Sequence, residues 1–494
     1  MYFGYKQLYI DGKLQDASAS SIQRQLCPAT LQPVADLAWG SEVDANKALD
    51  AARKAFPSWS ALSLDERTEW MMGLRDAVKA REEDLRMAVM HEMGKPWNAT
   101  AEDFDTLVKS LRWYPQAMRQ IEEISIADRE NQFVHRMLSK PVGVVVALLA
   151  WNFPLLNVAF KLAPALAAGC TIVIKPSPMS ALSAYLLAEI AASITFPPGV
   201  INIICGPDDS VGKTLSSSAI PRLLTMIGSS AVGRKLVAQG ATSIKRMSME
   251  LGGNAPAMVF EDADLKKAAR EIAALKFGNA GQICVSPNRI LVQSVAMPEF
   301  INLLQQEADA IRIGFGRDSG ATMGPLIDDA ARRRVDGLVK EALAEGATLV
   351  RGGNKPLGVG PGYFYEPTIL TDVTGDMRIS REEIFGPVAT VVAFESEDEV
   401  ISIANDTAYG LVAFAYTKDE ERILRLISRL EFGEIMINGY KWDIDLPHGG
   451  IKESGVGKDC SVLALDDYLV KIRVTVALNP STAIKTDQEH SHGF

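Results

Sequence analysis

Three residues stand in short segments that could place them together at a reaction centre. Cys284 closes the segment Asn279-Ala-Gly-Gln-Ile-Cys284, in which Gly281 indicates a loop. A cysteine thiolate is a strong nucleophile once its pKa is lowered, for example at a helix N-terminus. Because most cysteines among apolar neighbours are simply small core residues, this interpretation of Cys284 depends on the residues that accompany it.

The other two residues are a glutamate and an asparagine. Glu250 lies between an apolar run and the Gly252-Gly253 turn, where a carboxylate is costly to bury unless it has a partner or a function. With a raised pKa, such a carboxylate is a good general base. Asn152 follows the first apolar run, and its side-chain amide could donate to a developing oxyanion. Taken alone, Glu250 could equally be a solvated loop carboxylate and Asn152 a structural loop residue.

Three further segments could bind a ligand. Lys175 ends a short apolar run and is either an exposed strand-end lysine or a cation at a ligand crevice. The glycine-rich turn from Gly228 to Gly233 leads into a predicted helix, whose N-terminal amides suit a phosphate, although the chain contains no GxGxxG fingerprint. Glu382 and Glu383 form an acidic pair that is followed closely by an aromatic residue.

Strand-length apolar runs alternate with helical segments along most of the chain. We expect strands at 142–150, 170–175, 200–204, 223–227, 243–249, 257–260, 289–293, 388–394 and 412–416, and helices at 155–168, 179–193, 264–277, 298–311, 331–345, 398–405 and 419–430. This order predicts an α/β fold with parallel sheets, whose ligands lie beyond the carboxyl ends of the strands. Because the alternation starts again near residue 252, we expect two such domains. Residues 43–93 are predicted to be helical, and a capping box of Ser63 and Glu66 predicts one long helix from there to Met93.

The composition disfavours several classes of protein. The 494 residues carry 51 Lys and Arg against 61 Asp and Glu, and the formal charge of −10 disfavours nucleic acids and acidic membranes as partners. The five cysteines are widely spaced without a CxxC pair, so we expect neither disulfides nor a metal site. Since we find no signal-peptide pattern and no apolar run long enough to span a membrane, we expect a soluble, cytoplasmic protein.

Together, in this order and spacing, the segments closely resemble the aldehyde dehydrogenase superfamily from about Tyr9 to about Val476. The segments that carry the resemblance are Glu92-Met-Gly-Lys-Pro96, Trp151-Asn-Phe-Pro154, Lys175-Pro-Ser177, Gly228 to Gly233, Glu250-Leu-Gly-Gly253, Asn279 to Cys284, Glu383-Ile-Phe-Gly-Pro387 and Gly449-Gly-Ile-Lys-Glu-Ser-Gly455. The resemblance implies a metal-free oxidation of an aldehyde to a carboxylic acid by NAD or NADP, with hydrolysis of a covalent thioester.

The same resemblance implies a role for each residue. Cys284 would be the nucleophile, Glu250 the base that activates water, and Asn152, with the backbone N–H of Cys284, the oxyanion hole. The cofactor would extend from its adenosine ribose at Lys175, past a pyrophosphate at the glycine-rich turn, to its nicotinamide ribose at Glu383. The whole cofactor site would comprise Trp151, Lys175, Gly228, Ser229, Gly233, Leu251, Glu383 and Phe385.

The family architecture also implies a division of the chain. The cofactor-binding domain would comprise residues 1–123, 141–251 and 440–466, the catalytic domain 252–439, and a small β oligomerisation arm 124–140 and 467–478. A homodimer or homotetramer follows by analogy. The polar tail, residues 479–494, is expected to be disordered.

Three departures from relatives bear on the cofactor, the substrate and redox control. Pro178 follows three positions after Lys175, where many NAD-preferring relatives have a Glu that repels a 2′-phosphate, so both NAD and NADP stay open as cofactors. Relatives that oxidise succinate semialdehyde typically carry arginines where this chain has Phe160 and Gly278, so an anionic substrate would lack bidentate partners. Ser286 stands where some relatives keep a second, redox-active cysteine.

By the same resemblance, the substrate pocket would comprise Phe153, Asn157, Phe160, Ile283, Val285, Trp442 and His448. Asn157 and His448 replace positions that are apolar in many relatives, which indicates a small polar aldehyde, such as a hydroxyaldehyde or semialdehyde, or a modest aromatic one; plain packing is the alternative for the set. Two other functions stay open. The presence of Glu250 counts against a dehydrogenase that passes its thioester to coenzyme A, and the presence of both Glu250 and Cys284 counts against an inactive structural or binding protein.

Overall fold

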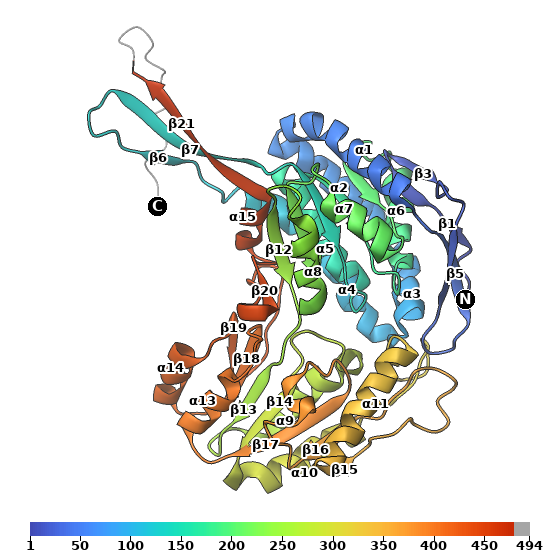
Figure 1. Cartoon of the computed structure of the whole chain (residues 1–494), viewed down its shortest axis with the longest axis vertical. Helices are drawn as coiled ribbons and strands as arrows, with labels where there is room; N and C mark the ends of the chain where they lie inside the picture. The colour runs from blue at the N-terminus through green and yellow to red at the C-terminus, as the bar shows by residue number, and fades with distance from the viewer. Residues whose placement is uncertain (479–494) are drawn as a thin grey trace.

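The computed structural model describes residues 1–478, so the disorder predicted for residues 479–494 lies outside the described part of the chain. Figure 1 shows two large α/β bodies stacked along the long axis, with a narrow β arm that projects from the upper body. Two large, mainly parallel sheets confirm the predicted α/β class. Within residues 1–478, no helix combines the length and the apolar character that a membrane span requires.

The first large sheet has eight strands, and its five central strands are parallel. Their order in the sheet is β20 (Gly455–Val456), β12 (Arg246–Glu250), β11 (Leu223–Ile227), β8 (Val144–Leu148), β9 (Thr171–Lys175), β10 (Ile201–Ile203), β2 (Leu8–Ile10) and β3 (Lys13–Gln15). The edge strands β20, β2 and β3 are antiparallel to their neighbours. The central strands are apolar on both faces, as expected for a sheet that helices cover on both sides.

Helices of the N-terminal half pack around this sheet. They are α1 (Glu42–Ala61), α2 (Leu64–Ala80), α3 (Glu82–Met93), α4 (Thr100–Met118), α5 (Pro154–Ala168), α6 (Leu182–Ser193), α7 (Lys213–Ser217) and α8 (Ser230–Gly240). Every residue of α5 is buried. Such a helix, apolar nearly all round, belongs in the interior of a large domain.

The long helix predicted from Ser63 to Met93 is wrong, because the chain forms two helices there. The capping box is present, since Ser63 accepts from the Glu66 backbone N–H while the Glu66 carboxylate accepts from that of Ser63. Arg81, with φ −114° and ψ 27°, then leaves the helical conformation and ends α2. The run from Glu82 to Asp84 supplies an acidic first turn to α3, which favours a new helix N-terminus at this point.

The second large sheet has seven strands. Their order is β15 (Thr348–Arg351), β16 (Thr368–Thr371), β17 (Val388–Phe394), β14 (Arg289–Gln293), β13 (Pro256–Val259), β18 (Val412–Tyr416) and β19 (Glu434–Ile437), all parallel except β15. Its helices are α9 (Leu265–Phe277), α10 (Met297–Asp309), α11 (Asp329–Ala344), α12 (Arg378–Arg381), α13 (Glu397–Asn405) and α14 (Glu420–Arg429). The predicted division into domains at these particular residues stays a prediction.

Two smaller sheets complete the described chain. One pairs β1 (Tyr5–Lys6), β5 (Pro33–Ala38) and β4 (Ile22–Leu26). The other forms the projecting arm, in which β21 (Leu469–Ala477) pairs with β7 (Phe133–Pro141) and β7 with β6 (Ile124–Ile126). The helix α15 (Leu465–Tyr468) leads into the arm. The segments predicted to form a β arm therefore do so, and its part in oligomerisation stays a prediction.

The register of the first sheet brings its strand ends to one edge. Leu148 pairs with Lys175, and Ile227 pairs with Glu250, so β8, β9, β11 and β12 end side by side. The second sheet faces these strand ends with the edge at which its own strands begin, because the segments that precede β13, β14 and β17 lead toward the strand ends of the first sheet. A site between the two sheets is therefore built from the C-terminal ends of strands in the first sheet and from the loops that precede strands in the second sheet.

Candidate active site

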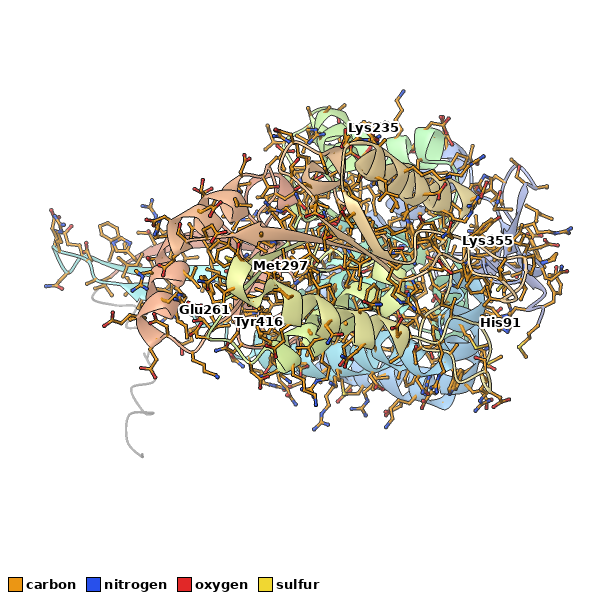
Figure 2. The ribbon with its side chains drawn as sticks, turned by 90° about the horizontal axis from the view of Figure 1, so that it is seen from below. His91, Lys235, Glu261, Met297, Lys355 and Tyr416 are labelled. Atoms are coloured by element: carbon orange, nitrogen blue, oxygen red, sulfur yellow. The ribbon has the colours of Figure 1, made fainter. Side chains whose placement is uncertain are left out.

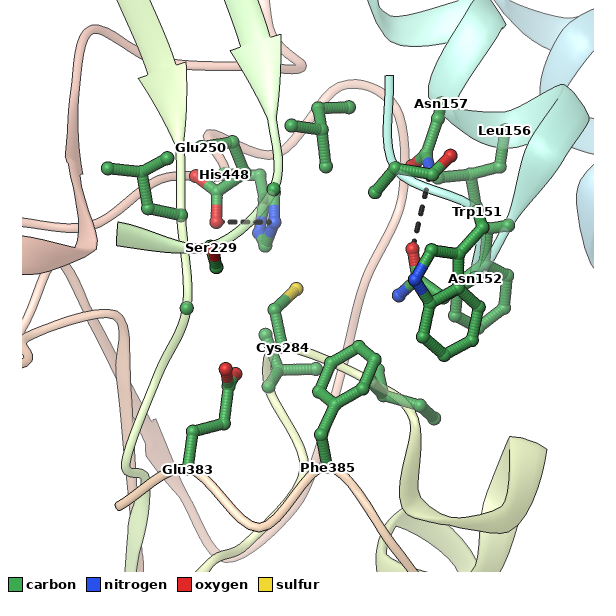
Figure 3. A pocket seen from close by; sticks show the side chains of 18 of the residues that line it. Trp151, Asn152, Leu156, Asn157, Ser229, Glu250, Cys284, Glu383, Phe385 and His448 are labelled. Carbon is green, nitrogen blue, oxygen red and sulfur yellow. Dashed lines mark hydrogen bonds and ion pairs between the residues drawn. The ribbon is translucent and has the colours of Figure 1, made fainter. Parts of the chain in front are cut away.

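A cavity of about 540 Å³ lies where these two edges meet, and it contains the predicted nucleophile, base and oxyanion donor. Figure 3 shows Cys284 near its centre, with the sulfur directed toward Glu250 and His448 and with Glu383 and Phe385 on the other side. Of the predicted site residues, Lys175 and Gly233 alone do not line this cavity. The structure therefore brings together segments that lie far apart in the sequence.

The loop that carries Cys284 is held in a conformation that few residues can adopt. Asn279 and Ala280 have φ of 48° and 54°, and Gly281 follows with φ of 74°. A Cβ atom on Gly281 would lie 2.1 Å from the Gly386 carbonyl oxygen, so a side chain at 281 would clash with backbone. The positive φ and this close approach both require glycine.

A buried glutamine anchors the same loop. Gln282 donates from Nε2 to the Asn279 carbonyl oxygen at 2.9 Å, and its Oε1 accepts from the Ile327 backbone N–H at 2.9 Å. Cys284 is partly exposed, whereas the other four cysteines are buried. The anchored loop thus presents the one cysteine that a small molecule in the cavity can reach.

The Asn152 side chain is fixed against this loop. Its Nδ2 donates to the Gln282 carbonyl oxygen at 3.1 Å, and its Oδ1 accepts from Asn157 Nδ2 at 3.3 Å. Asn279 Nδ2 donates to the Asn152 carbonyl oxygen at 3.0 Å. Because an amide nitrogen carries two hydrogens, one N–H of Asn152 is not used in this bond to Gln282.

Glu250 is the last residue of β12 and lies in a cluster with two other reactive groups. Ligand atoms of Glu250, Cys284 and His448 all lie within 4.8 Å of one another. Glu250 Oε1 is 3.5 Å from His448 Nε2 and accepts no hydrogen bond. Burial raises the pKa of the Glu250 carboxyl to about 7, with His448 acting in the opposite direction. A carboxyl that titrates near neutral pH suits general-base catalysis.

Two charged residues that the sequence analysis missed support this cluster. Lys161 Nζ lies 2.6 Å from Asp459 Oδ1, with both side chains buried. Asp459 and His448 exchange two backbone hydrogen bonds of 2.8 and 2.7 Å. The signal for Lys161 was present, because a lysine inside an otherwise apolar buried helix needs a charged partner.

The predicted cofactor residues form a path that begins at a second cavity of about 120 Å³. Lys175, at the end of β9, lines this cavity and pairs with the exposed carboxylate of Asp208, a partner that the sequence analysis missed. Ile227 lines both cavities, so they adjoin. Gly233 lies in the first turn of α8, and a Cβ atom on it would be 2.8 Å from Leu251 Cδ1. The absence of a side chain at Gly233 therefore lets α8 pack closely against Leu251.

The path continues over the N-terminus of α8 to a buried glutamate. Ser229 caps α8 by accepting from the Val232 backbone N–H, and backbone N–H groups at such a terminus suit phosphate. Glu383 Oε1 accepts from the Gly253 backbone N–H at 2.9 Å, and burial raises the pKa of the Glu383 carboxyl to about 7. Phe385 meets Trp151 edge-on, with ring centroids 5.4 Å apart.

The opposite end of the large cavity has aromatic walls and few charges. Phe160 packs near Trp442, with ring centroids 5.9 Å apart. Within the described part of the chain, Arg334 is the only arginine or lysine that lines this cavity, and it donates to the carbonyl oxygen of Glu383, on the other side of the cavity. Glu102 is exposed and also lines the cavity. The residues predicted for the substrate pocket therefore line one cavity, and in the described part of the chain no arginine or lysine lies at this end to pair with an anionic tail.

Comparison with known proteins gives matches along nearly the whole chain. The sequence model of the "Aldehyde dehydrogenase family" matches residues 15–473. The chain is 38% identical over 465 residues to an NADP⁺-dependent succinate-semialdehyde dehydrogenase from Escherichia coli K12, an alignment that covers 94% of this chain and 96% of that protein. It is 36% identical over 466 residues to a 3-sulfolactaldehyde dehydrogenase from Pseudomonas putida, with 94% and 95% covered.

The fold comparison agrees with the sequence comparison. A solved structure of lactaldehyde dehydrogenase from Escherichia coli matches with a TM-score of 0.93 at 34% identity. The match covers 96% of this chain and 98% of that one. The similarity of fold thus extends over nearly the whole chain.

Proposed function

The chain belongs to the aldehyde dehydrogenase family of NAD(P)-dependent oxidoreductases, and from this premise we propose that it oxidises a small, uncharged, polar aldehyde to the carboxylic acid through a thioester on Cys284. The observation that carries the proposal is the cluster in which Cys284 Sγ and a Glu250 carboxylate oxygen lie within 4.8 Å at the cavity. A nucleophile beside a base with a near-neutral pKa suits formation and hydrolysis of a covalent intermediate.

The residues along the two adjoining cavities fit a nicotinamide dinucleotide. Lys175 offers a cation for the adenosine ribose, the capped N-terminus of α8 offers amides for phosphate, and buried Glu383 offers a carboxylate for the second ribose. Gly252 leaves room beside Glu383, because a Cβ atom there would lie 2.7 Å from Glu383 Oε2. When bound, NAD(P)⁺ supplies the acceptor for a hydride.

The first half of the reaction is performed by Cys284 and Asn152. The Cys284 thiolate attacks the aldehyde carbon, a C–S bond forms, and the carbonyl oxygen becomes an oxyanion. The free N–H of Asn152 donates to that oxygen, and one such donor can contribute about 10²–10³ in rate. The carbonyl then reforms as the C–H bond breaks and its electron pair leaves as hydride, which gives a thioester on Cys284.

The second half is performed by Glu250. Its carboxylate accepts a proton from a water molecule, and the resulting hydroxide adds to the thioester carbonyl. The C–S bond breaks, Cys284 leaves as a thiolate, and the carboxylic acid is released. Because the Glu250 pKa is about 7, a large fraction of the enzyme carries this base at neutral pH.

The substrate class follows from the walls of the cavity. Phe160 and Trp442 offer aromatic surfaces, whereas Asn157 and His448 offer polar groups. A carboxylate tail would meet the carboxylate of Glu102 rather than an arginine, and a buried anion without a partner is costly. We therefore place a neutral hydroxylated tail here.

Steady-state kinetics over a panel of aldehydes test this proposal. We expect small hydroxyaldehydes, such as glycolaldehyde and lactaldehyde, to give a kcat/KM at least about tenfold above that of succinate semialdehyde, because a missing ionic partner costs more than 1.4 kcal/mol. Hexanal serves as the apolar control of greater length. Higher kcat/KM for hexanal, or for succinate semialdehyde, would contradict the assigned substrate class while leaving the reaction class intact.

A second prediction concerns the choice between NAD and NADP. Pro178 lines the small cavity together with Lys175 and Lys235, and Lys235 is exposed on the outer face of α8 (Figure 2). Replacing Pro178→Glu adds a carboxylate near the adenosine ribose, and opposed like charges cost several kcal/mol. We expect kcat/KM for NADP to fall at least about tenfold relative to that for NAD.

The control for this prediction is Lys235→Ala, which removes a cation from the same wall. We expect it to lower kcat/KM for NADP more than for NAD, though less than Pro178→Glu does. An unchanged NADP/NAD ratio in Pro178→Glu would show that the 2′-phosphate is bound elsewhere.

The arm supports a homo-oligomer as the working form of the enzyme. Apolar side chains remain exposed on it within the described chain: Ile124, Ile126, Phe133 and Val476. Exposed apolar patches of this kind mark protein interfaces. We propose that two or four chains associate through the arm, in the cytoplasm.

A further inference from the structure

His448 is a buried histidine held among three ionisable groups. Its Nε2 lies 3.5 Å from Glu250 Oε1, and its Nδ1 lies 2.8 Å from Glu434 Oε1. The second contact is an ion pair rather than an aligned hydrogen bond, because Nδ1 has no acceptor along its N–H direction. Figure 3 shows the Cys284 sulfur directed toward this ring.

The surroundings of the ring favour its protonated form. Burial by itself lowers the pKa of His448, but Glu250, Cys284 and Glu434 oppose burial and hold that pKa well above its usual value. A buried cation is tolerated where opposite charges pair with it. The distances to these groups and their charges therefore favour the imidazolium form of His448.

The other charged side chains around His448 are either paired with one another or lie farther from its ring than Glu250 and Glu434 do. Lys161 is neutralised by Asp459, directly behind the His448 backbone. Glu383 approaches Cys284 from the opposite wall of the cavity. Burial is the largest cause that raises the pKa of the Cys284 thiol, and Glu250 and Glu383 raise it further. His448 is the group that opposes them, through a hydrogen bond and its charge.

Glu434 has a fixed position because of the strand that it begins. It is the first residue of β19, and its Oε1, the atom nearest His448 Nδ1, accepts from the Gly449 backbone N–H at 3.1 Å. This bond joins the carboxylate to the residue that follows His448. Glu434 thus holds both the ring and the backbone beside it.

We propose that His448 is a further catalytic residue, whose imidazolium stabilises the Cys284 thiolate before it attacks the aldehyde, and that Glu434 is its positioning residue. The thiol proton passes from Cys284 Sγ to a Glu250 carboxylate oxygen, so the S–H bond breaks, an O–H bond forms, and the thiolate remains opposite the imidazolium. Glu250 releases that proton through the cavity before it activates water. This inference rests on the proposed role of Cys284 as nucleophile.

The pH dependence of alkylation by iodoacetamide, without cofactor or aldehyde, tests the inference separately from turnover. Labelling at Cys284 is followed by peptide mass spectrometry, which separates it from the four buried cysteines. In His448→Phe we expect the midpoint of the rate–pH profile to rise by at least about one pH unit, and the rate at pH 7 to fall about tenfold, because the cation is lost. Glu434→Gln should move the midpoint the same way by a smaller amount.

A buried histidine elsewhere provides the matched control. His91 packs edge-on to Phe3 and Phe315 among the N-terminal helices (Figure 2), and burial lowers its pKa to about 4, so it is neutral. His91→Phe should leave the alkylation profile unchanged. His448→Gln removes the charge with a polar side chain, and it replaces His448→Phe if that variant does not fold.

Two outcomes would overturn the inference. One is a wild-type profile in both His448 variants, which would make the histidine a packing residue. The other is an equal shift in His91→Phe, which would assign the effect to loss of packing. Failure of the proposed function would give a different result. Iodoacetamide would still label Cys284 with the expected pH profile, but turnover would not require Cys284.

Discussion

Cys284→Ala is expected to lower NAD(P)H formation from aldehyde by a factor of about 10⁴ or more, the order of loss when a covalent nucleophile is removed. Without the sulfur, no C–S bond forms, and the hydride would have to leave from an aldehyde hydrate that nothing in the cavity is built to hold. The other cysteines cannot take its place, because they are buried. The measurement is the initial rate of absorbance increase at 340 nm under saturating cofactor and aldehyde.

The control for this variant is Cys170→Ala. Cys170 is buried immediately before β9, where its sulfur lies 3.4 Å from the Tyr468 carbonyl oxygen, and burial raises its pKa to about 11. We expect this variant to keep its activity with a slightly lower melting temperature. If Cys284→Ala kept the wild-type rate of NAD(P)H formation and the wild-type thermal stability, the covalent mechanism would be wrong.

The sequence predicts the parts of this site that depend on local pattern. Apolar runs locate β8, β9, β11 and β12 to within a few residues. Because parallel strands end at a common edge, the residues at these ends could be expected to converge. Lys175 and Glu250 lie at that edge in the strand register, and Asn152 and Gly228 follow the neighbouring strand ends, Leu148 and Ile227. Local periodicity and one topological rule are sufficient for this result.

Contacts between distant segments could not be predicted in the same way. The partner of His448 is Glu434, on the first residue of a short strand that no alternation marks. Lys161 and Asp459 form a buried pair although 298 residues separate them. A single sequence gives the type of each residue but not its neighbour in space, so His448 could be predicted as a pocket residue and not as a charge.

The break at Arg81 illustrates a different limit. The capping box at Ser63 and the periodicity beyond it are compatible with one long helix, and intrinsic propensity does not separate the alternatives. The acidic run that starts α3 was a signal for a second N-terminus. Continuity of the pattern favours one long helix, but it is a weak argument because helices average about 11–12 residues.

Glu250→Gln is expected to separate the two halves of the reaction. Glutamine can still donate and accept hydrogen bonds, but it cannot accept a proton from water, so thioester hydrolysis should slow by about 10²–10⁴. Acylation of Cys284 should also slow, because Glu250 accepts the thiol proton, but it should slow less than hydrolysis, since His448 still stabilises the thiolate once the proton has left to solvent. Stopped-flow absorbance should therefore show a burst that approaches one NAD(P)H per chain, followed by slow turnover, and mass spectrometry should find the acyl group on Cys284.

The pH dependence of hydrolysis has a definite sign. Burial raises the pKa of the Glu250 carboxyl to about 7, and the base is its deprotonated form. The hydrolytic rate of the wild-type enzyme should therefore rise as the pH increases through about 7 and fall below it. Glu250→Gln should lose this limb of the profile, and a limb that persists unchanged would assign it to another group.

A buried carboxyl outside the cavity provides the control for the Glu250 variant, and coenzyme A distinguishes the competing reaction. Burial raises the pKa of Glu92 to about 8, and its carboxylate accepts from the Ser183 backbone N–H, so Glu92→Gln removes a similar group without touching the site and should keep full activity.

If the enzyme acylated coenzyme A, adding that thiol to Glu250→Gln would restore continuous NAD(P)H formation and yield acyl-coenzyme A, because a thiolate needs no base to attack the thioester. We expect no such rescue. Glu250 is a buried carboxylate beside Cys284 whose Oε1 accepts no hydrogen bond, and a hydrolytic enzyme needs such a base there whereas an acylating enzyme does not.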